Sequence, residues 1–144
     1  MNNNLALNAS ISLADAGYQI TGNGTGTFTM GASSTLTLGT IATATSFPTS
    51  FTNAHISLDA ASTVVYNSNI AQTISVVPTY GNLTLSSTAT VTKTISSAAT
   101  VATNLNVGVN NTLSVTGAGT IQINTGNLIL NGILNNSGTI NIGL

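Results

Sequence analysis

The sequence predicts an all-β protein that folds as a β-solenoid of roughly five to seven coils. A motif of the form Asn-Leu-x-(Leu/Val) begins at Asn82, Asn104 and Asn127, and these starts lie 22 and 23 residues apart. A fixed period in the twenties, with one or two short alternating segments in each repeat, is typical of stacked repeat architectures. Thr, Val, Ile, Ser, Asn and Gly dominate while helix formers such as Glu and Lys are scarce, so short strands are favoured over helices.

The first part of the chain, residues 1–39, is predicted to form the first coils. Apolar and polar residues alternate there with the period of two that is typical of half-buried strands. Glycines such as Gly22 and Gly31 separate the alternating segments and suit the corners between strands. The expected strands cover residues 5–7, 11–13, 25–30 and 35–38.

Residues 40–53 interrupt the alternation with a Thr/Ser-rich segment that contains Phe47, Pro48 and Phe51. Pro48 has no backbone N–H and cannot donate to a central strand ladder. We therefore expect an irregular loop that bulges out of the solenoid in its first half.

Regular coils are expected over residues 54–144, so that the whole chain of 144 residues forms one solenoid domain. The alternation resumes after the loop and continues into the Asn-Leu repeats. The sequence predicts strands at residues 55–58, 62–66 and 72–77, a turn at residues 78–81 and a last strand at residues 138–144.

The Asn residues that open successive coils predict a ladder of stacked side chains. Amides at equivalent positions can hydrogen-bond along the stacking direction, as in cross-β packing. The Leu after each Asn would stack inside the core, and Leu5, Thr35 and His55 are assigned as the equivalent starts of earlier coils. The residues expected in the regular part of this stack are Asn82, Leu83, Asn104, Leu105, Asn127 and Leu128.

Several short segments of the second half also resemble a known family. They are Thr-Val-Val-Tyr-Asn at 63–67, Gln-Thr-Ile at 72–74, Tyr-Gly-Asn-Leu-Thr-Leu-Ser at 80–86, Lys-Thr-Ile at 93–95 and Asn-Leu-Asn-Val at 104–107. In order and spacing they resemble the tandem repeats of large secreted surface proteins of Bacteroidetes-type bacteria. Those repeats form extracellular β-solenoid regions similar to autotransporter and haemagglutinin passengers, often exported by the type IX route. The resemblance covers roughly residues 60–144 and implies a cell-surface location, but it brings no catalytic or ligand residues.

The near absence of charge limits the partners that we expect. Asp15, Asp59 and Lys93 are the only acidic or basic residues, and the net charge is -1. A nucleic-acid partner is not expected, because neutralising phosphates takes a cluster of Lys and Arg. Membrane insertion is not expected either, because no apolar run approaches the roughly 20 residues of a spanning helix. A net charge close to zero favours association, so the expected partner is the chain itself.

Candidate catalytic and metal-binding residues are few. His55 and Asp59 form the one suggestive pair, but on an extended strand they would lie about 13 Å apart. We expect a solvent-facing His55, a turn at Asp59 and an exposed Lys93 on a strand. With no Cys, one His and two Asp, the chain falls short of the usual ligand set of a zinc or calcium site. The sequence therefore predicts no enzyme, no catalytic residue, no metal and no cofactor.

These observations favour a non-catalytic, extracellular structural protein, a subunit of a filament, stalk or sheath on a bacterial surface. No polar cap follows the predicted last strand, and an uncovered coil exposes ladder groups and apolar side chains. We expect the chain either to continue in its parent protein or to dock another copy head to tail. The residues expected at this contact are Asn4, Leu5, Leu7, Ile11 and Leu13 at one end and Thr139, Ile140, Asn141, Ile142 and Leu144 at the other.

Two other functions are considered. In an adhesin, the solenoid would be a spacer and the aromatic residues of the 40–80 region would stack on surface glycans; these are Phe47, Phe51, Tyr66 and Tyr80. In an ice-binding protein, regular rows of Thr would face the ice; the candidate rows are Thr25, Thr27 and Thr29, and Thr35 and Thr37.

Overall fold

A computed structural model describes residues 4–143 and confirms the predicted fold class: the chain is an all-β, parallel β-solenoid of about six turns. Only one three-residue 3₁₀ turn, Asn53–His55, interrupts the strands and their connections within that range. The strands are β1 (Leu5–Leu7), β2 (Ser12–Ala14), β3 (Phe28–Met30), β4 (Thr35–Leu38), β5 (Ile56–Leu58), β6 (Thr63–Asn67), β7 (Gln72–Thr73), β8 (Thr79–Tyr80), β9 (Asn82–Ser86), β10 (Val91–Ile95), β11 (Ala98–Val101), β12 (Leu105–Val107), β13 (Asn111–Val115), β14 (Thr120–Ile123), β15 (Leu128–Leu130), β16 (Ile133–Asn136) and β17 (Thr139–Ile142).

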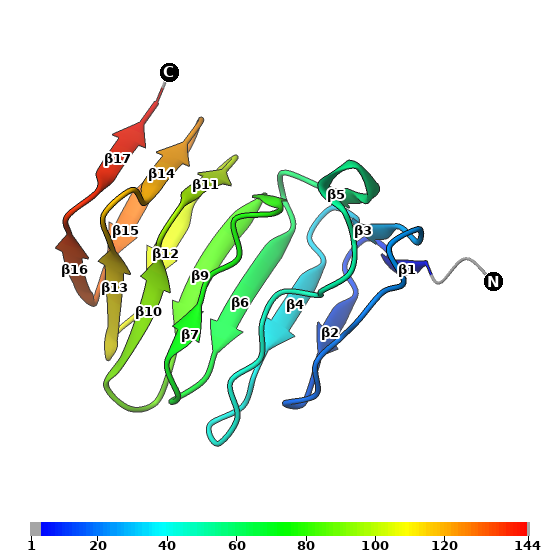
Figure 1. Ribbon diagram of the computed structural model, residues 1–144, viewed down its shortest axis with the longest axis horizontal. Helices are drawn as coiled ribbons and strands as arrows, with labels where there is room; N and C mark the ends of the chain where they lie inside the picture. Colours follow the sequence, from blue (N-terminus) through cyan, green and yellow to red (C-terminus); the bar gives the residue numbers. More distant parts are fainter. Residues whose placement is uncertain (1–3, 144) are drawn as a thin grey trace.

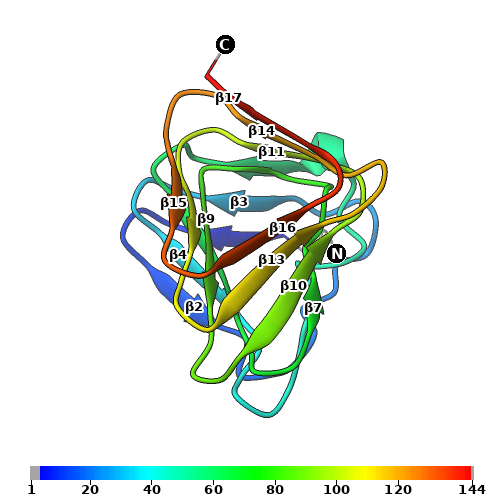
Figure 2. The ribbon, with the colours of Figure 1, turned by 90° about the vertical axis from the view of Figure 1, so that its left-hand side faces the viewer.

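The coils stack into three sides around one core. The first side is a six-stranded sheet in the order β15-β12-β9-β6-β4-β2, and the second is a four-stranded sheet in the order β16-β13-β10-β7. On the third side the sheet β17-β14-β11-β8 meets the sheet β1-β3-β5 where β5 lies against β8. Figure 1 shows the coils side by side along the long axis, and Figure 2 shows the three sides from the C-terminal end.

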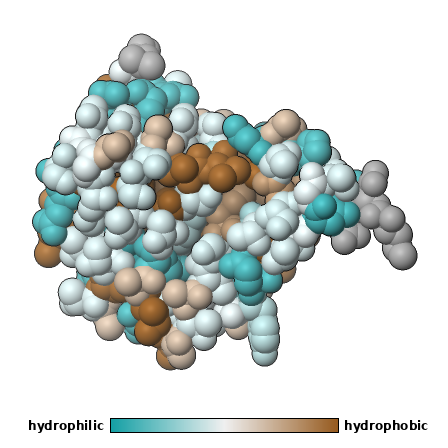
Figure 3. Space-filling view, viewed as in Figure 1, coloured by the Kyte–Doolittle hydropathy of each residue, from teal (hydrophilic) through white to brown (hydrophobic). Residues whose placement is uncertain are grey.

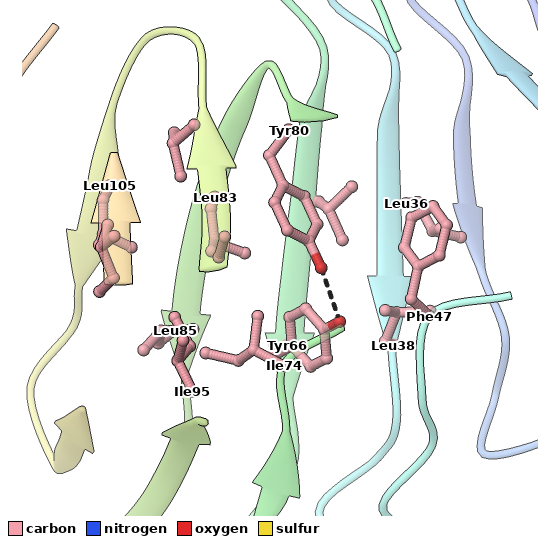
Figure 4. Packing of buried hydrophobic residues seen from close by; sticks show 14 of the residues in the cluster. Leu36, Leu38, Phe47, Tyr66, Ile74, Tyr80, Leu83, Leu85, Ile95 and Leu105 are labelled. Carbon is pink, nitrogen blue, oxygen red and sulfur yellow. Dashed lines mark hydrogen bonds between the residues drawn. The ribbon is translucent and has the colours of Figure 1, made fainter. Parts of the chain in front are cut away.

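The core follows from the period of two within each strand. In β9, Leu83 and Leu85 point inward and are buried, while Thr84 between them lies on the outer face. Register then repeats the inward residue from coil to coil, so that Leu83 is paired with Val64 in β6 and with Leu105 in β12. Burying one such side chain stabilises the fold by about 1.5–3 kcal/mol, and Figure 4 shows part of this core from close by.

The coil register corrects the predicted set of equivalent starts. Leu5 lies on the third side, in register with Phe28 and then Ile56 beside His55, whereas Thr35 lies on the six-stranded sheet. Steps of 23, 28, 19, 22 and 23 residues separate the true equivalents on that sheet. These equivalents are Ser12, Thr35, Thr63, Asn82, Asn104 and Asn127.

Residues 40–53 contain no strand, but they do not bulge out of the solenoid as a whole. Phe47 and Phe51 are buried, with ring centroids 5.4 and 5.7 Å from that of Phe28. Phe47 also meets the ring of Tyr80 edge-on at 6.0 Å. Each buried aromatic side chain takes about 150–250 Å² of surface out of water. The free energy gained by this burial favours the inward position of the segment.

The backbone of the same segment closes the first two coils. Thr49 forms a parallel bridge with Thr21, and its carbonyl accepts the N–H of Gly22 at 2.8 Å. The N–H of Gly24 donates to the carbonyl of Ser50 at 2.7 Å. Residues 40–53 therefore form an irregular second side of the second coil rather than an excursion from it.

The region of residues 72–81 also differs from the prediction, because buried tyrosines bind its backbone. Tyr66 Oη accepts the N–H of Ser75 at 3.0 Å, and the hydroxyl of Tyr80 donates to the Ser75 carbonyl at 2.7 Å. The two hydroxyls lie 2.9 Å apart (Figure 4). The predicted strand at residues 72–77 therefore stops after β7, and residues 79–80, which were predicted as part of a turn, form β8.

Candidate functional site

His55 and Asp59 lie at opposite ends of β5. Asp59 is exposed, and its Oδ1 accepts the N–H of Ala61 at 2.8 Å in a tight turn. His55 is half-buried at the end of the 3₁₀ turn. Between residues 4 and 143, no three His, Cys, Asp or Glu side chains come close enough to hold a metal ion together.

Asp15 is buried and joins the first two coils. Its Oδ1 accepts the N–H groups of Gly17 and Gly39, both at 2.9 Å, and its Oδ2 accepts the hydroxyl of Thr45. Three donors therefore satisfy the side-chain oxygens of Asp15 in this buried place. Asp15 therefore has a structural role, because its side chain joins the turn after β2 to the segment after β4.

Lys93 was predicted to be exposed, and this prediction is wrong. The side chain is fully buried, and its Nζ donates to the carbonyl of Ser68 at 2.6 Å and to Gln72 Oε1 at 2.5 Å. Burial lowers the pKa of Lys93 from 10.5 to about 8. The signal was present in the sequence, because Val91, Lys93 and Ile95 alternate along β10 and so share its inner side.

The Asn residues of successive coils are joined by hydrogen bonds. Asn82 Oδ1 accepts the backbone N–H of Asn104 at 3.3 Å and its Nδ2 at 3.2 Å. Asn104 Oδ1 accepts the backbone N–H of Asn127 at 3.0 Å. Beside this column Leu83 and Leu105 are buried, and Leu128 in the last coil is partly buried.

Asn4 makes the same kind of contact at the other end of the solenoid. Its Oδ1 accepts the N–H of Thr27, the residue before β3, at 2.9 Å. A side-chain oxygen of one coil thus receives the backbone N–H of the equivalent residue in the next coil at both ends. Asn4 is bound to the second coil of its own chain.

The last coil exposes its inner side. β15, β16 and β17 are the end strands of their sheets, so their outer edges carry backbone groups without a neighbouring strand in the described part of the chain. Their inward residues Leu130 and Ile142 are 45% and 52% exposed although they continue the buried columns of Val107 and Ile123. Leu128, Leu134 and Ile140 are partly buried.

The residues of the predicted C-terminal contact therefore have different positions. Ile140 and Ile142 face the core column, whereas Thr139 and Asn141 alternate with them on the outer face of β17. Leu144 lies outside the described residues. The prediction missed Leu130 and Leu134, although the alternation of Leu128 and Leu130 along β15 marks the inward side of that strand.

The first coil presents the other end. β1 and β2 are end strands, and their inward residues Leu5 and Leu13 are partly buried. Leu7 is already buried within its own chain, while Ile11 lies between the two strands and is exposed. Leu13 heads the column that runs through Leu36, Val64, Leu83 and Leu105 to Leu128.

The aromatic residues considered for glycan stacking lie in the core. Tyr66 and Tyr80 are fully buried, and burial raises the pKa of Tyr66 to about 12. Only Phe47 and Phe51 reach a cavity of about 340 Å³ between residues 46–51 and residues 73–77, which appears in Figure 3 as a hollow bordered by hydrophobic residues. The cavity is lined by Ser46, Phe47, Pro48, Thr49, Ser50, Phe51, Thr73, Ser75 and Val77.

The Thr rows are shorter than the ice-binding expectation requires. Thr25 and Thr27 precede β3 and are not part of a strand, so only Thr29 of that row lies in the sheet. Thr35 and Thr37 do point outward from β4. Their columns continue through Asn, Val and Ile residues in later coils, so the hydroxyls do not form a regular array.

Fold and end surfaces together define a class: a three-sided, parallel β-solenoid with edge strands at its ends. Searches of family models, curated proteins and solved structures give no match to this chain. Within residues 4–143 there is no helix with the length and hydropathy needed to cross a membrane.

Proposed function

We propose that this chain is a non-catalytic structural protein, a β-solenoid subunit that stacks end to end into a filament, stalk or sheath. The observation that carries the proposal is the exposed inner side of the last coil. Leu130 and Ile142 are about half exposed at positions where the preceding coils bury Val107 and Ile123. Each large aliphatic side chain left in water forfeits about 1.5–3 kcal/mol of burial free energy, which a further β layer recovers.

The occupant that we propose is the first coil of a second copy. The six-stranded sheet then continues across the junction, with Leu128 of one copy over Leu13 of the next. On the third side, Ile140 comes over Leu5. Each of these residues is partly buried on its own and apolar, so the two ends match in chemistry.

Asn127 would continue the ladder of Asn side chains across the junction. Its N–H donates to Asn104 Oδ1, and its own side-chain amide is the last of the column. In the stacked pair, the N–H of Ser12 in the next copy would donate to Asn127 Oδ1. This bond would repeat the one that the N–H of Asn127 makes to Asn104 Oδ1. This directional contact favours one register over a slipped one, which a purely apolar contact would not do.

A contact between opposite ends does not close on itself and so generates a linear polymer. The low charge supports this mode, since a net charge of -1 gives the copies little mutual repulsion. The resemblance of roughly residues 60–144 to repeats of secreted bacterial surface proteins supports an extracellular location on the cell surface.

Two neighbouring residues of β15 provide a matched test by electron microscopy. Leu130 points inward and is 45% exposed, while Ile129 points outward and is 42% exposed. We expect the unaltered chain to form filaments with a subunit repeat of roughly 30 Å, from about 4.8 Å for each coil. The Leu130→Lys variant should remain monomeric and folded by circular dichroism, while Ile129→Lys should still form filaments.

Two results would contradict end-to-end stacking. One is a chain that stays as short, discrete rods at high concentration. The other is equal filament formation by Leu130→Lys and Ile129→Lys, because a junction through the inner side must distinguish them.

The second candidate function is glycan binding by an adhesin, and the cavity beside residues 46–51 is the observation that favours it. Its lining combines hydroxyl-bearing residues such as Ser46 and Thr73 with the aromatic residues Phe47 and Phe51. A glycan array with the Thr73→Val variant tests it, with Thr92→Val on the outer face of β10 as control. Binding lost only in Thr73→Val would support this function, and no binding by the unaltered chain would exclude it.

A further inference from the structure

The amine of Lys93 and the side-chain amide of Gln72 meet inside the core, between two neighbouring coils. The two residues are register partners in β10 and β7, and both side chains point inward. Lys93 Nζ lies 2.5 Å from Gln72 Oε1. Lys93 is fully buried and Gln72 is 4% exposed. An amine and a carboxamide are thus held against each other out of contact with solvent, which is the condition under which an intramolecular reaction gains most from proximity.

The groups around Lys93 do not neutralise its charge. Both acceptors of its Nζ in the described part of the chain are neutral carbonyl oxygens, that of Gln72 and that of Ser68 at 2.6 Å. A protonated Nζ has three hydrogens, and these contacts satisfy two of them. A buried ammonium group without a carboxylate partner is costly, and burial lowers the pKa of Lys93 to about 8. The free amine, which is the nucleophilic form, is therefore accessible close to neutral pH.

The nitrogen of the Gln72 amide is held by acceptors of its own. Its Nε2 donates to the carbonyl of Thr45 at 2.9 Å and to the carbonyl of Leu38 at 3.3 Å. These contacts orient the amide so that its oxygen meets Lys93 and its nitrogen meets the two carbonyls. Carbonyl oxygens stabilise protons and positive charge on a nitrogen, so they would favour the departure of Nε2 as ammonia.

We propose that Lys93 and Gln72 form an intramolecular isopeptide bond. Rotation about the Cε–Nζ bond turns the lone pair of the neutral Nζ towards Gln72 Cδ, and the lone pair attacks this carbon. The bond from Cδ to Nε2 breaks, and Nε2 takes the proton that Nζ gives up and leaves as ammonia. The product is a secondary amide between Cδ and Nζ, and no oxidant or other reactant is consumed.

The carbonyl of Ser68 lies at a similar distance from Nζ, but attack there would not persist. The displaced group would be the backbone amine of Asn69, which stays tethered beside the new bond and reverses the step. Ammonia released from Gln72 diffuses away, so only the reaction with Gln72 proceeds to completion.

The bond would fasten β7 to β10 by a covalent link in a chain that has no Cys to form a disulfide. It replaces a buried charge by a neutral amide, which removes the cost of desolvating the ammonium group. It also closes a loop over residues 72–93, and a closed loop restricts the unfolded chain as a disulfide does. The cross-link lies within one chain, so it does not depend on the end-to-end contact.

Trypsin and mass spectrometry test this bond directly, because Lys93 is the only Lys or Arg of the chain. Trypsin needs a free Lys or Arg side chain, so after unfolding in urea it cuts the open chain once, after Lys93, and leaves the cross-linked chain whole. We expect the unaltered chain, kept folded at mildly alkaline pH, to become resistant and to lose the mass of one ammonia molecule. A succinimide at an Asn-Gly step also loses ammonia, but it leaves Lys93 open to trypsin.

Gln72→Glu is the matched variant, since it keeps an acceptor for Lys93 but presents a carboxylate, which an amine does not attack. It should keep its full mass and be cut completely. Gln122→Glu, on the outer face of β14, should become resistant like the unaltered chain. An unaltered chain of full mass that trypsin cuts completely would overturn the proposal, whatever the stability of the variants. Equal resistance of Gln72→Glu would overturn it as well.

The open and the cross-linked chain also differ in their response to pH. Only the open, freshly folded chain keeps a titrating amine at Lys93, so an increase of stability above about pH 8 belongs to this form. The increase should disappear in step with the loss of ammonia. A chain that has lost ammonia and still shows the full increase would place the modification away from Lys93.

Discussion

At the scale of single residues, a few buried polar side chains decide how this nearly uncharged chain responds to pH. Lys93 is the only basic residue other than His55, and it lies in the core against Ser68 and Gln72. Tyr66 and Tyr80 share a buried hydrogen bond. Because so few other groups titrate, the linkage between proton binding and folding should be readable from these three residues.

We predict that the free energy of unfolding rises from pH 8 to about pH 10 and falls above it. The pKa of Lys93 is lowered to about 8, so between pH 8 and 10.5 the unfolded chain binds more protons and stability increases with pH, by on the order of 2 kcal/mol. Burial raises the pKa of Tyr66 to about 12 and that of Tyr80 well above 10.0, so above pH 10 the folded chain holds more protons and stability decreases. Urea unfolding across this range measures both limbs.

The Lys93→Met variant is the control for the rising limb. It should lose the increase between pH 8 and 10 and keep the decrease above pH 10. An unchanged rise in Lys93→Met would mean that another group is responsible.

We also predict that Asn104→Ala destabilises the solenoid by about 1–2 kcal/mol, because it removes the hydrogen bond from Asn104 Nδ2 to Asn82 Oδ1 and the one from the N–H of Asn127 to Asn104 Oδ1. Asn106, two residues further along in β12, is a matched control, since its side-chain oxygen is buried without a hydrogen-bond partner. Asn106→Ala should change stability by less than about 0.5 kcal/mol. Equal melting temperatures for the two variants would show that the Asn ladder does not stabilise the solenoid.

At the scale of elements, the segment of residues 40–53 replaces a regular strand with buried aromatic rings. Phe47 lies between Phe28 and Tyr80 and fills the core where the second coil lacks a strand on one side (Figure 4). The same replacement opens the cavity between this segment and residues 73–77, because no hydrogen-bonded strand spans that gap. Irregularity in this coil thus both closes the core and makes the hollow on the surface.

We predict that Phe47→Ala costs about 3–5 kcal/mol, as expected for a large side chain removed from a packed core. Ile41→Ala, in the same segment but 66% exposed, should cost less than about 0.5 kcal/mol. Chemical denaturation of both variants measures the difference. Similar small effects would mean that the segment is an external loop.

At the scale of the whole molecule, stability should vary along the solenoid axis. Strand pairing joins each coil to its neighbours, so inner coils have two stabilising interfaces and the terminal coils have one. The described C-terminal coil is the extreme case, since its core residues Leu130 and Ile142 are about half exposed.

We therefore predict that amide hydrogen exchange of the monomer is slowest in β9 and β12 and fastest in β15–β17. Once filaments form, protection of β15–β17 should rise towards that of the inner coils, because the first coil of the next copy covers them. Exchange measured by mass spectrometry on Leu130→Lys and on filaments compares the two states. Filaments whose β15–β17 amides exchange as fast as in the monomer would place the contact elsewhere.

The architecture and its repeating unit follow from local features of the sequence. The period of 22 and 23 residues between Asn82, Asn104 and Asn127 and the alternation within β9 and β12 are local properties, and local geometry is enough to predict stacked short strands. Leu83, Leu105 and Leu128 were expected to stack and are in register, since equal spacing in a repeat places equivalent residues in one column.

Contacts between distant parts of the chain, by contrast, fix which irregular residues belong to the core. Phe47 sits in a Thr/Ser-rich stretch without alternation, and its inward position depends on Phe28 and Tyr80, which are distant in sequence. The strand at residues 79–80 and the bend before it depend likewise on the hydroxyls of Tyr66 and Tyr80. Tyr18, Ile41, Ile70 and Val109 lie at one corner because each follows a strand of the six-stranded sheet, and the unequal steps between coils hide that alignment in the linear sequence.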